Sequence, residues 1–370
     1  NLGLAVIIPD LPSTFRPEDY EVLPSSPDTP QNLSRKRRRS EVDDGDDLIR
    51  SVDQRQKNDG AFRNLREYFQ EIFEAEDQVQ PDSGPSSPML ALCSEGITLS
   101  LAAQAKVEIL LQRVIDANRF SQIPLDDLLR VQKLCEGALK DAETVDVKAD
   151  EGMGESEVGT WLQQISVAEL GIKAARISLK LMSGGREEKQ LYSEDVIQTA
   201  LSAFKNATET CLIPIVEMRN SGPAAAVFKL FSAQKSHIGN LLSHCRKLFS
   251  LVASLVSTIE LSETVINTLE FTASRLIFVE NAPSERESIV KISKFDSLRV
   301  VAMDVLAQIF LCNPAQRQGI FDEILTSLEK LPVTKQSARQ FKLAEGGSIQ
   351  LVSALIMRLI QTSASKVDDA

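Results

Sequence analysis

The sequence predicts an all-α protein: a superhelix of HEAT-like α-hairpins, preceded by a globular helical portion and a disordered N-terminal tail. Of its 370 residues, 43% are hydrophobic but only 5% are aromatic. This balance is typical of helices packed through aliphatic side chains rather than of β-sandwiches. Apolar residues recur at helical spacing from Ser94 onward, and no stretch alternates apolar and polar residues between hairpin signals. We therefore expect serial helices and no sheet.

Residues 1–58 are predicted to be a disordered tail. Prolines interrupt the tail repeatedly, and a basic run is followed by an acidic one. Low hydrophobic content with dense charge cannot offset the entropy lost on ordering. The basic run predicts a nuclear import signal; the alternatives are an arm balanced by the neighbouring acids and an auxiliary DNA-contacting tail. Its five consecutive residues are Arg35, Lys36, Arg37, Arg38 and Arg39.

Four hydroxyl side chains in the exposed linkers are candidate phosphorylation sites. Three of them precede proline, and the fourth follows the basic run. Such dipeptides also occur often by chance, so the alternative is an unmodified linker. The candidates are Ser26, Thr29, Ser40 and Ser87.

Residues 59–93 are predicted to form one amphipathic helix, over residues 61–76, and a Pro/Ser linker. Asp59 or Gly60 is the expected cap at its start. A short helix of this kind needs a surface to lie on, either on its own chain or in a partner's groove. The helix-docking candidates are Phe62, Leu65, Phe69, Ile72 and Phe73, which recur at helical spacing.

Two helical regions should follow, a globular domain over residues 94–220 and the first HEAT-like repeats over residues 221–370. Pro124 is placed to open a helix, and Gly184-Gly185 to end one. A compact irregular bundle is the alternative for residues 94–218. Residues 295–311 and 315–331 should pair as an antiparallel hairpin. Helices are expected over residues 99–120, 125–143, 158–182, 193–219, 224–258 (one helix or a broken pair), 261–279, 295–311, 315–331 and 347–362.

The formal net charge of −11 disfavours non-specific nucleic-acid binding by the chain as a whole, because phosphate attraction needs clustered Lys and Arg. A local candidate for contacting DNA or a partner is Lys330, Lys335, Arg339 and Lys342. If residues 334–342 are helical, the last three share one face. The alternative is a solvated helix face.

No constellation for catalysis is found, and we expect neither an enzyme nor a cofactor. Gly152 and Gly154 lie among acids that would repel a pyrophosphate. His237 and His244 lack the spacing and further ligands of a zinc site, so interhelical packing is the favoured interpretation. The five cysteines form no Cys-x-x-Cys pair and suit a reducing compartment. No apolar run reaches the ~18 residues that cross a bilayer, so no membrane partner is expected.

Residues 296–362 resemble the Nipped-B or adherin family of cohesin-loading factors. The most specific part is the run from Arg317 to Pro332, an Ile-x-x-Glu-Ile-x-x-x-Leu-x-x-Leu-Pro helix. Lys335 and an Arg-x-Phe-x-Leu connector over residues 339–343 follow, and then an Ile-Gln-led helix from Ser348. The short connection over residues 345–348 is similar to that of fungal members. An unrelated helical-repeat adaptor, such as a transport-receptor-like solenoid, would have no reason to pair this connector with this helix, and it is the alternative.

The resemblance implies a HEAT-repeat scaffold that acts in the nucleus on chromatin. It would load the cohesin ring for sister chromatid cohesion and stimulate the cohesin ATPase without being an ATPase itself. Its implied partners are DNA and the cohesin subunits, namely the kleisin and the ATPase heads. A small tetratricopeptide-like loader partner would bind residues N-terminal to this chain. Because the chain begins at Asn1 without an initiator methionine, we expect it to be an excerpt.

Overall fold

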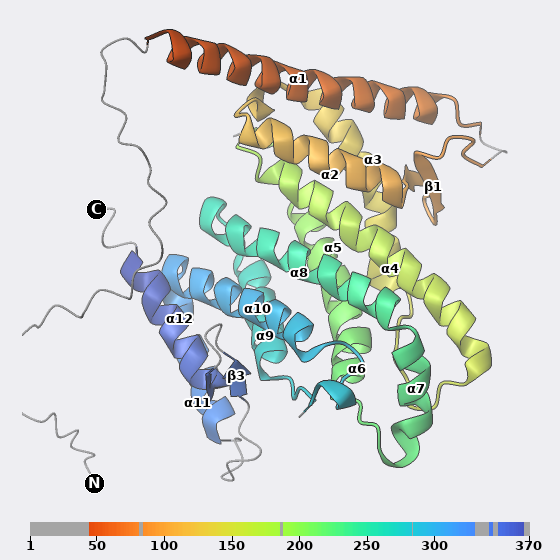
Figure 1. The fold of residues 1–370 in the computed structure, drawn as a ribbon, viewed down its shortest axis with the longest axis vertical. Coiled ribbons are helices and arrows are strands. Elements are labelled where there is room, and N and C mark those ends of the chain that lie inside the picture. Colours follow the sequence, from red (N-terminus) through yellow and green to blue (C-terminus); the bar gives the residue numbers. More distant parts are fainter. Residues whose placement is uncertain are drawn as a thin grey trace, which may run out of the picture. The chain divides into compact units, whose positions relative to one another are not determined.

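The computed structural model describes residues 44–80, 84–185, 188–282, 284–329, 340–342 and 347–365. The chain divides into two units, residues 1–52 and residues 53–370. In the described part of the first unit, residues 44–52 are the beginning of α1 (Asp44–Asp77). The second unit contains the rest of α1 and all the other elements, which are almost entirely helical (Figure 1). The predicted all-α class is confirmed.

Helix α1 begins well before the predicted start at Asp59 or Gly60, and it runs through both of these residues. The prediction of disorder is therefore wrong for residues 44–58, while residues 1–43 lie outside the described residues. The charge-dense segment before the amphipathic helix therefore continues that helix, which the composition of the segment alone did not indicate.

Helices α1, α2 and α3 surround one hydrophobic core together with a small hairpin. Strand β1 (Leu90–Cys93) pairs antiparallel with β2 (Gly96–Leu99), and Gly96 has a φ of 125°, a conformation that favours glycine. The expectation of no sheet is wrong here, because four-residue strands are too short to display an alternating pattern. The helices of this core are α2 (Leu101–Asp116), α3 (Leu125–Thr144) and, between them, the 3₁₀ turn η2 (Phe120–Gln122).

Helix α4 (Glu155–Met182) lies between this core and a second, larger one. Ala174, Ile177 and Leu181 face the first core, whereas Ile172 and Leu179 belong to the second. Helix α8 (Lys235–Thr258) packs on α4 along one side and on α10 (Ile292–Cys312) along the other, as Figure 1 shows. The second core is built from α5 (Glu194–Lys205), η3 (Asn206–Leu212), α6 (Ile213–Glu217), η4 (Gly222–Ala224), α7 (Ala225–Ala233), α8 (Lys235–Thr258), α9 (Glu263–Phe278), η5 (Glu285–Glu287) and α10 (Ile292–Cys312).

Two of the long predicted helices are interrupted. The one over residues 193–219 contains a π-helical stretch, η3, before Pro214, which lacks the N–H that a regular α-helix would use there. The one over residues 224–258 is a broken pair, since α7 and α8 are separated at Gln234. For residues 224–258, the alternative of a broken pair is the correct one.

The last elements are η6 (Pro314–Gln316), α11 (Arg317–Glu329), β3 (Gln340–Lys342), β4 (Ser348–Gln350) and α12 (Leu351–Ser365). Helix α10 meets α11 through Phe310 and Phe321, whose rings pack edge to face with centroids 5.3 Å apart, but α10 packs mainly on α8 and α9. The final helix begins at Leu351 rather than at residue 347, because the preceding residues pair with β3. Among the described residues, no helix is long and apolar enough to span a membrane.

Candidate functional site

The interface of α2, α4 and α8 contains a buried charged seam. Helix α4 places Lys173, Arg176 and Lys180 on one face, since they are separated by three and four residues. Their exposed fractions are only 9%, 4% and 7%. A buried charge is costly unless carboxylates or hydrogen bonds compensate it, so the partners of these cations decide what the seam does.

Arg176 connects all three helices of the seam. Its guanidinium donates to the Glu108 carboxylate of α2, and its Nη1 lies 2.8 Å from Nδ1 of His244 on α8. Because a guanidinium has no acceptor, His244 Nδ1 must accept this bond and its Nε2 must carry the proton. That Nε2 lies 3.1 Å from Glu169 Oε1. The chain of contacts fixes the tautomer of His244 and the register of α2, α4 and α8.

The seam holds more positive than negative charge. Burial lowers the pKa of Lys173, of Arg176 and of Lys180. The hydrogen bond from His244 is the main cause that lowers the pKa of Glu169. Lys173 Nζ donates to the Leu101 carbonyl at 2.9 Å. Among the described residues, Arg176 Nε has no hydrogen-bond partner, and Lys180 Nζ forms an ion pair with Glu108 at 3.8 Å. This arrangement can orient helices and attract anions.

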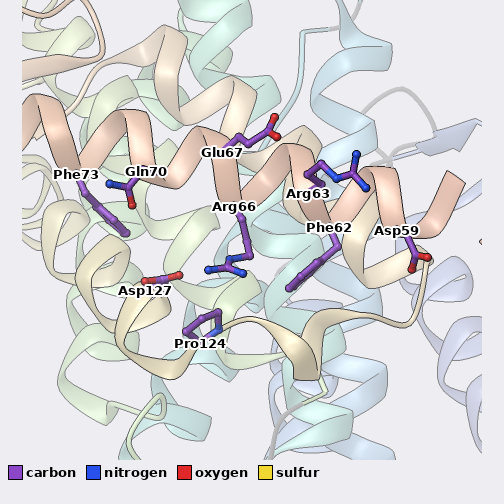
Figure 2. A pocket seen from close by; sticks show the side chains of 9 residues that line it. All are labelled: Asp59, Phe62, Arg63, Arg66, Glu67, Gln70, Phe73, Pro124 and Asp127. Atoms are coloured by element: carbon purple, nitrogen blue, oxygen red, sulfur yellow. The ribbon is translucent and has the colours of Figure 1, made fainter. Parts of the chain in front are cut away.

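A second feature is an open groove of about 660 Å³ between α1 and the start of α3 (Figure 2). The rings of Phe62 and Phe73 and the guanidinium groups of Arg63 and Arg66 line it. Asp59, at one end, is paired with Arg119 at 2.9 Å. The groove is lined by apolar rings and by side chains of both positive and negative charge. It therefore has the character of a shallow peptide-sized surface rather than of a catalytic pocket.

The predicted helix-docking residues of α1 pack on the chain itself. Leu65, Phe69 and Ile72 are completely buried, and Phe73 is 5% exposed, in the core formed with α2 and α3. Only Phe62 is left half-buried, at the groove. Of the two alternatives for this helix, the described structure contains packing on the same chain.

The other candidates from the sequence mostly lie outside the described residues. This holds for the basic run over residues 35–39, for Ser26, Thr29 and Ser40, and for Lys330, Lys335 and Arg339. Ser87 is described: it is half-buried, and its hydroxyl accepts a hydrogen bond from the Met89 N–H at 3.3 Å. Lys342 lies in strand β3, which pairs with β4, so the condition that residues 334–342 are helical is not met at Lys342.

Sequence reasoning missed the charged seam, although one signal for it exists. Every residue from Gly171 to Met182 is buried, so this half of α4 is enclosed on all sides, which is typical of a central helix. Three cations within such a helix must find partners inside the protein. His244 was expected to serve interhelical hydrogen bonding, and it lies between Arg176 and Glu169.

The fold and the seam together define a class, the helical-repeat scaffold. Within the described ranges, no three His, Cys, Asp or Glu side chains gather so as to hold a metal ion. No family model matches the chain. It is 28% identical to sister chromatid cohesion protein mis4 of Schizosaccharomyces pombe, over 47% of this chain and 11% of mis4. It is 26% identical to Nipped-B-like protein A of Danio rerio, over 65% of this chain and 10% of that protein.

A solved structure extends this likeness to the fold. The C-terminal fragment of the cohesin loader SCC2 of Chaetomium thermophilum is 45% identical, with a TM-score of 0.78, over 84% of this chain and 24% of that one. The chain belongs to the Nipped-B/Scc2 family of cohesin loaders. It spans about a tenth of the length of these curated relatives and about a quarter of the solved chain.

Proposed function

We propose that this chain forms part of the non-enzymatic scaffold of a cohesin loader. The whole protein would act in the nucleus, where it helps to load the cohesin ring onto chromatin for sister chromatid cohesion. The observation that carries the proposal is the 45% identity to a cohesin loader over 84% of this chain. A likeness this high over most of the described helices includes the surface as well as the core, so it supports a shared function and not only a shared fold.

The proposed partners are the kleisin and ATPase-head subunits of cohesin, and DNA. In the whole protein, these contacts would stimulate the cohesin ATPase, and a tetratricopeptide-like partner would bind residues that precede this chain. The relatives' names, which specify cohesin loading and sister chromatid cohesion, support this assignment. The chemistry would belong to cohesin. The buried thiols fit the role of a non-enzymatic scaffold. Burial raises the pKa of Cys135 to about 12 and also raises that of Cys211, which leaves both thiols unreactive.

Capture of purified cohesin by the immobilised chain tests the proposal. We expect the chain to retain a complex that contains the kleisin and both ATPase heads, and to retain it after nuclease treatment, which removes bridging DNA. An unrelated helical-repeat protein of similar charge serves as the control. If both proteins retain the same amount of cohesin, or if nuclease abolishes capture, the scaffold proposal is wrong.

The proposed nuclear address is the basic run over residues 35–39. Five consecutive cations suit the acidic grooves of import receptors. In a fluorescent fusion of the full chain, replacing all five by Gln should shift the protein from the nucleus to the cytoplasm. Replacement of Lys133, Lys189 and Lys229, three exposed lysines elsewhere, should leave it nuclear. Equal distribution of the two variants would contradict the assignment.

A further inference from the structure

Helix α8 is an acid-free helix in an acidic chain. The chain's net charge is −11, yet residues 235–258 contain no Asp or Glu. Most polar residues of its first half are exposed or half-exposed, because the opposite side carries the aliphatic residues that fill the core. His244 instead points to α4. Nine of its exposed or half-exposed residues form what we call the α8 face: Lys235, Ser236, His237, Asn240, Ser243, Arg246, Lys247, Ser250 and Ser254.

Cations from both neighbouring helices adjoin the α8 face. On the α10 side, the Lys294 ammonium lies over Gly239. A Cβ added to Gly239 would lie 3.2 Å from Lys294 Nζ. On the α4 side, Lys173 is close enough to Lys247 for mutual repulsion to contribute to its lowered pKa, and Arg246 acts on Arg176 in the same way. Positive charge therefore continues across α4, α8 and α10, which lie side by side in Figure 1.

Arg176 is paired with Glu108 in the buried seam, whereas the cations of α8 and Lys294 have no such partner among the described residues. None of Lys235, Arg246, Lys247 and Lys294 forms an ion pair with a residue that the structure describes. The neighbouring carboxylates are already engaged. Glu169 contacts His244 on α8, and on α10 Asp296 lies 2.6 Å from Arg299. An anionic ligand would therefore meet free cations and hydrogen-bond donors, with no unengaged acid among the residues of the α8 face.

We infer that the α8 face binds the phosphate backbone of duplex DNA without reading its sequence. This deepens the DNA contact of the proposed function and rests on it. Lys235 and Lys247 are separated by twelve residues, or about 18 Å along a helix. Because duplex DNA carries one charge per ~1.7 Å of axis, this length spans several phosphates. Serine, asparagine and lysine side chains are the donors that contact such phosphates.

The α8 face favours nucleic acid over a protein partner because it lacks an apolar anchor. Protein interfaces depend on a few aromatic or aliphatic side chains buried at their centre. Among the described residues, the large exposed apolar side chains include Leu92, Ile109, Phe271 and Leu325, and none lies on α8. A surface that consists of donors and cations is typical of non-specific phosphate binding.

Fluorescence anisotropy with a labelled duplex of about 30 bp, titrated with the full chain at several salt concentrations, tests the inference. The variant K235E/K247E/K294E should weaken binding at least tenfold, and it should lower the slope of log K against log salt by about 0.9 for each phosphate that the variant no longer neutralises. The variant K133E/K189E/K229E makes the same change in net charge on exposed lysines outside the α8 face, and it should bind nearly as the unaltered chain does.

Three results would overturn the inference: no binding by the unaltered chain, equal weakening by the two variants, or no weakening by the α8 variant. Circular dichroism and thermal unfolding of both variants exclude a folding defect. Cohesin capture after nuclease treatment separates this inference from the proposed function, because the α8 variant should still retain cohesin. If it loses cohesin while DNA binding is unchanged, the α8 face is a protein interface and the inference fails.

Discussion

Gly171 lies at the closest approach of α3 and α4, and its replacement by Ala tests how tightly these helices pack. A Cβ at this position would lie 2.3 Å from the Ala138 carbonyl oxygen and 2.3 Å from the Ala142 Cβ. Neither atom belongs to a flexible side-chain end, so rotamer changes cannot relieve the clash. Ordinary carbon–carbon contact is at about 3.5–4.0 Å, and the helices would therefore have to separate by more than an ångström.

The expected loss of stability follows from two opposing effects. Overpacking of a tight interface costs about 1–3 kcal/mol, and separating α3 from α4 also loosens the neighbouring Leu139 and Ile172, which are buried. Replacing Gly by Ala within a helix gains at most about 1 kcal/mol. We therefore expect Gly171→Ala to lower the free energy of unfolding by about 1–2 kcal/mol.

Urea unfolding followed by the fluorescence of Trp161 provides the assay. This is the chain's single tryptophan, it lies on α4, and its ring packs 5.0 Å from that of Phe231. Gly159→Ala is the matched control, because a Cβ there has no atom within 4 Å. It should raise stability by about 0.5–1 kcal/mol through helix propensity alone. If both substitutions change stability in the same direction, the close packing of α3 on α4 is refuted.

Three further predictions concern the seam and α8. The depressed pKa of Glu169 means that its carboxylate stabilises the fold above the ordinary carboxyl range, and that this stabilisation is lost as pH falls through the folded-state pKa. Glu169→Gln should therefore flatten the fall of the urea midpoint in acid. An unchanged profile would contradict this. Arg176→Ala should cost about 3–5 kcal/mol in urea unfolding, and a loss under about 1 kcal/mol would show that the seam contributes little. Gly239→Ala should stabilise α8 by about 0.5–1 kcal/mol, because the flexible end of Lys294 can move aside; a fall in Tm would refute that.

The sequence allowed the helices with strong boundary signals to be predicted well. Pro124 and the apolar period located α3 with the same first residue, Leu125, and Gly184-Gly185 follows the end of α4 closely. Boundaries without such residues were less accurate. Helix α1 begins at Asp44, several turns before the expected first residue, Ala61, because a charged helical turn has the composition of a disordered tail.

The functional surfaces were harder to predict because they depend on contacts distant in sequence. Arg176 meets Glu108 and His244, each 68 residues away along the chain. Nothing local in α4 indicates which helix supplies the carboxylate. The absence of acids from α8 was readable from the sequence, but its relation to Lys294 depends on the packing of α10 against α8. The shared face considered for Lys335, Arg339 and Lys342 required a helix, whereas the structure has a strand at Lys342.

The most direct test of the central claim is the affinity of this chain for purified cohesin. Biolayer interferometry, with the chain immobilised and nuclease-treated cohesin in solution, measures it without DNA bridging. A scaffold of the Nipped-B/Scc2 family predicts saturable binding that the soluble chain competes away. The absence of saturable binding, or binding equal to that of an unrelated helical-repeat protein, would contradict the claim.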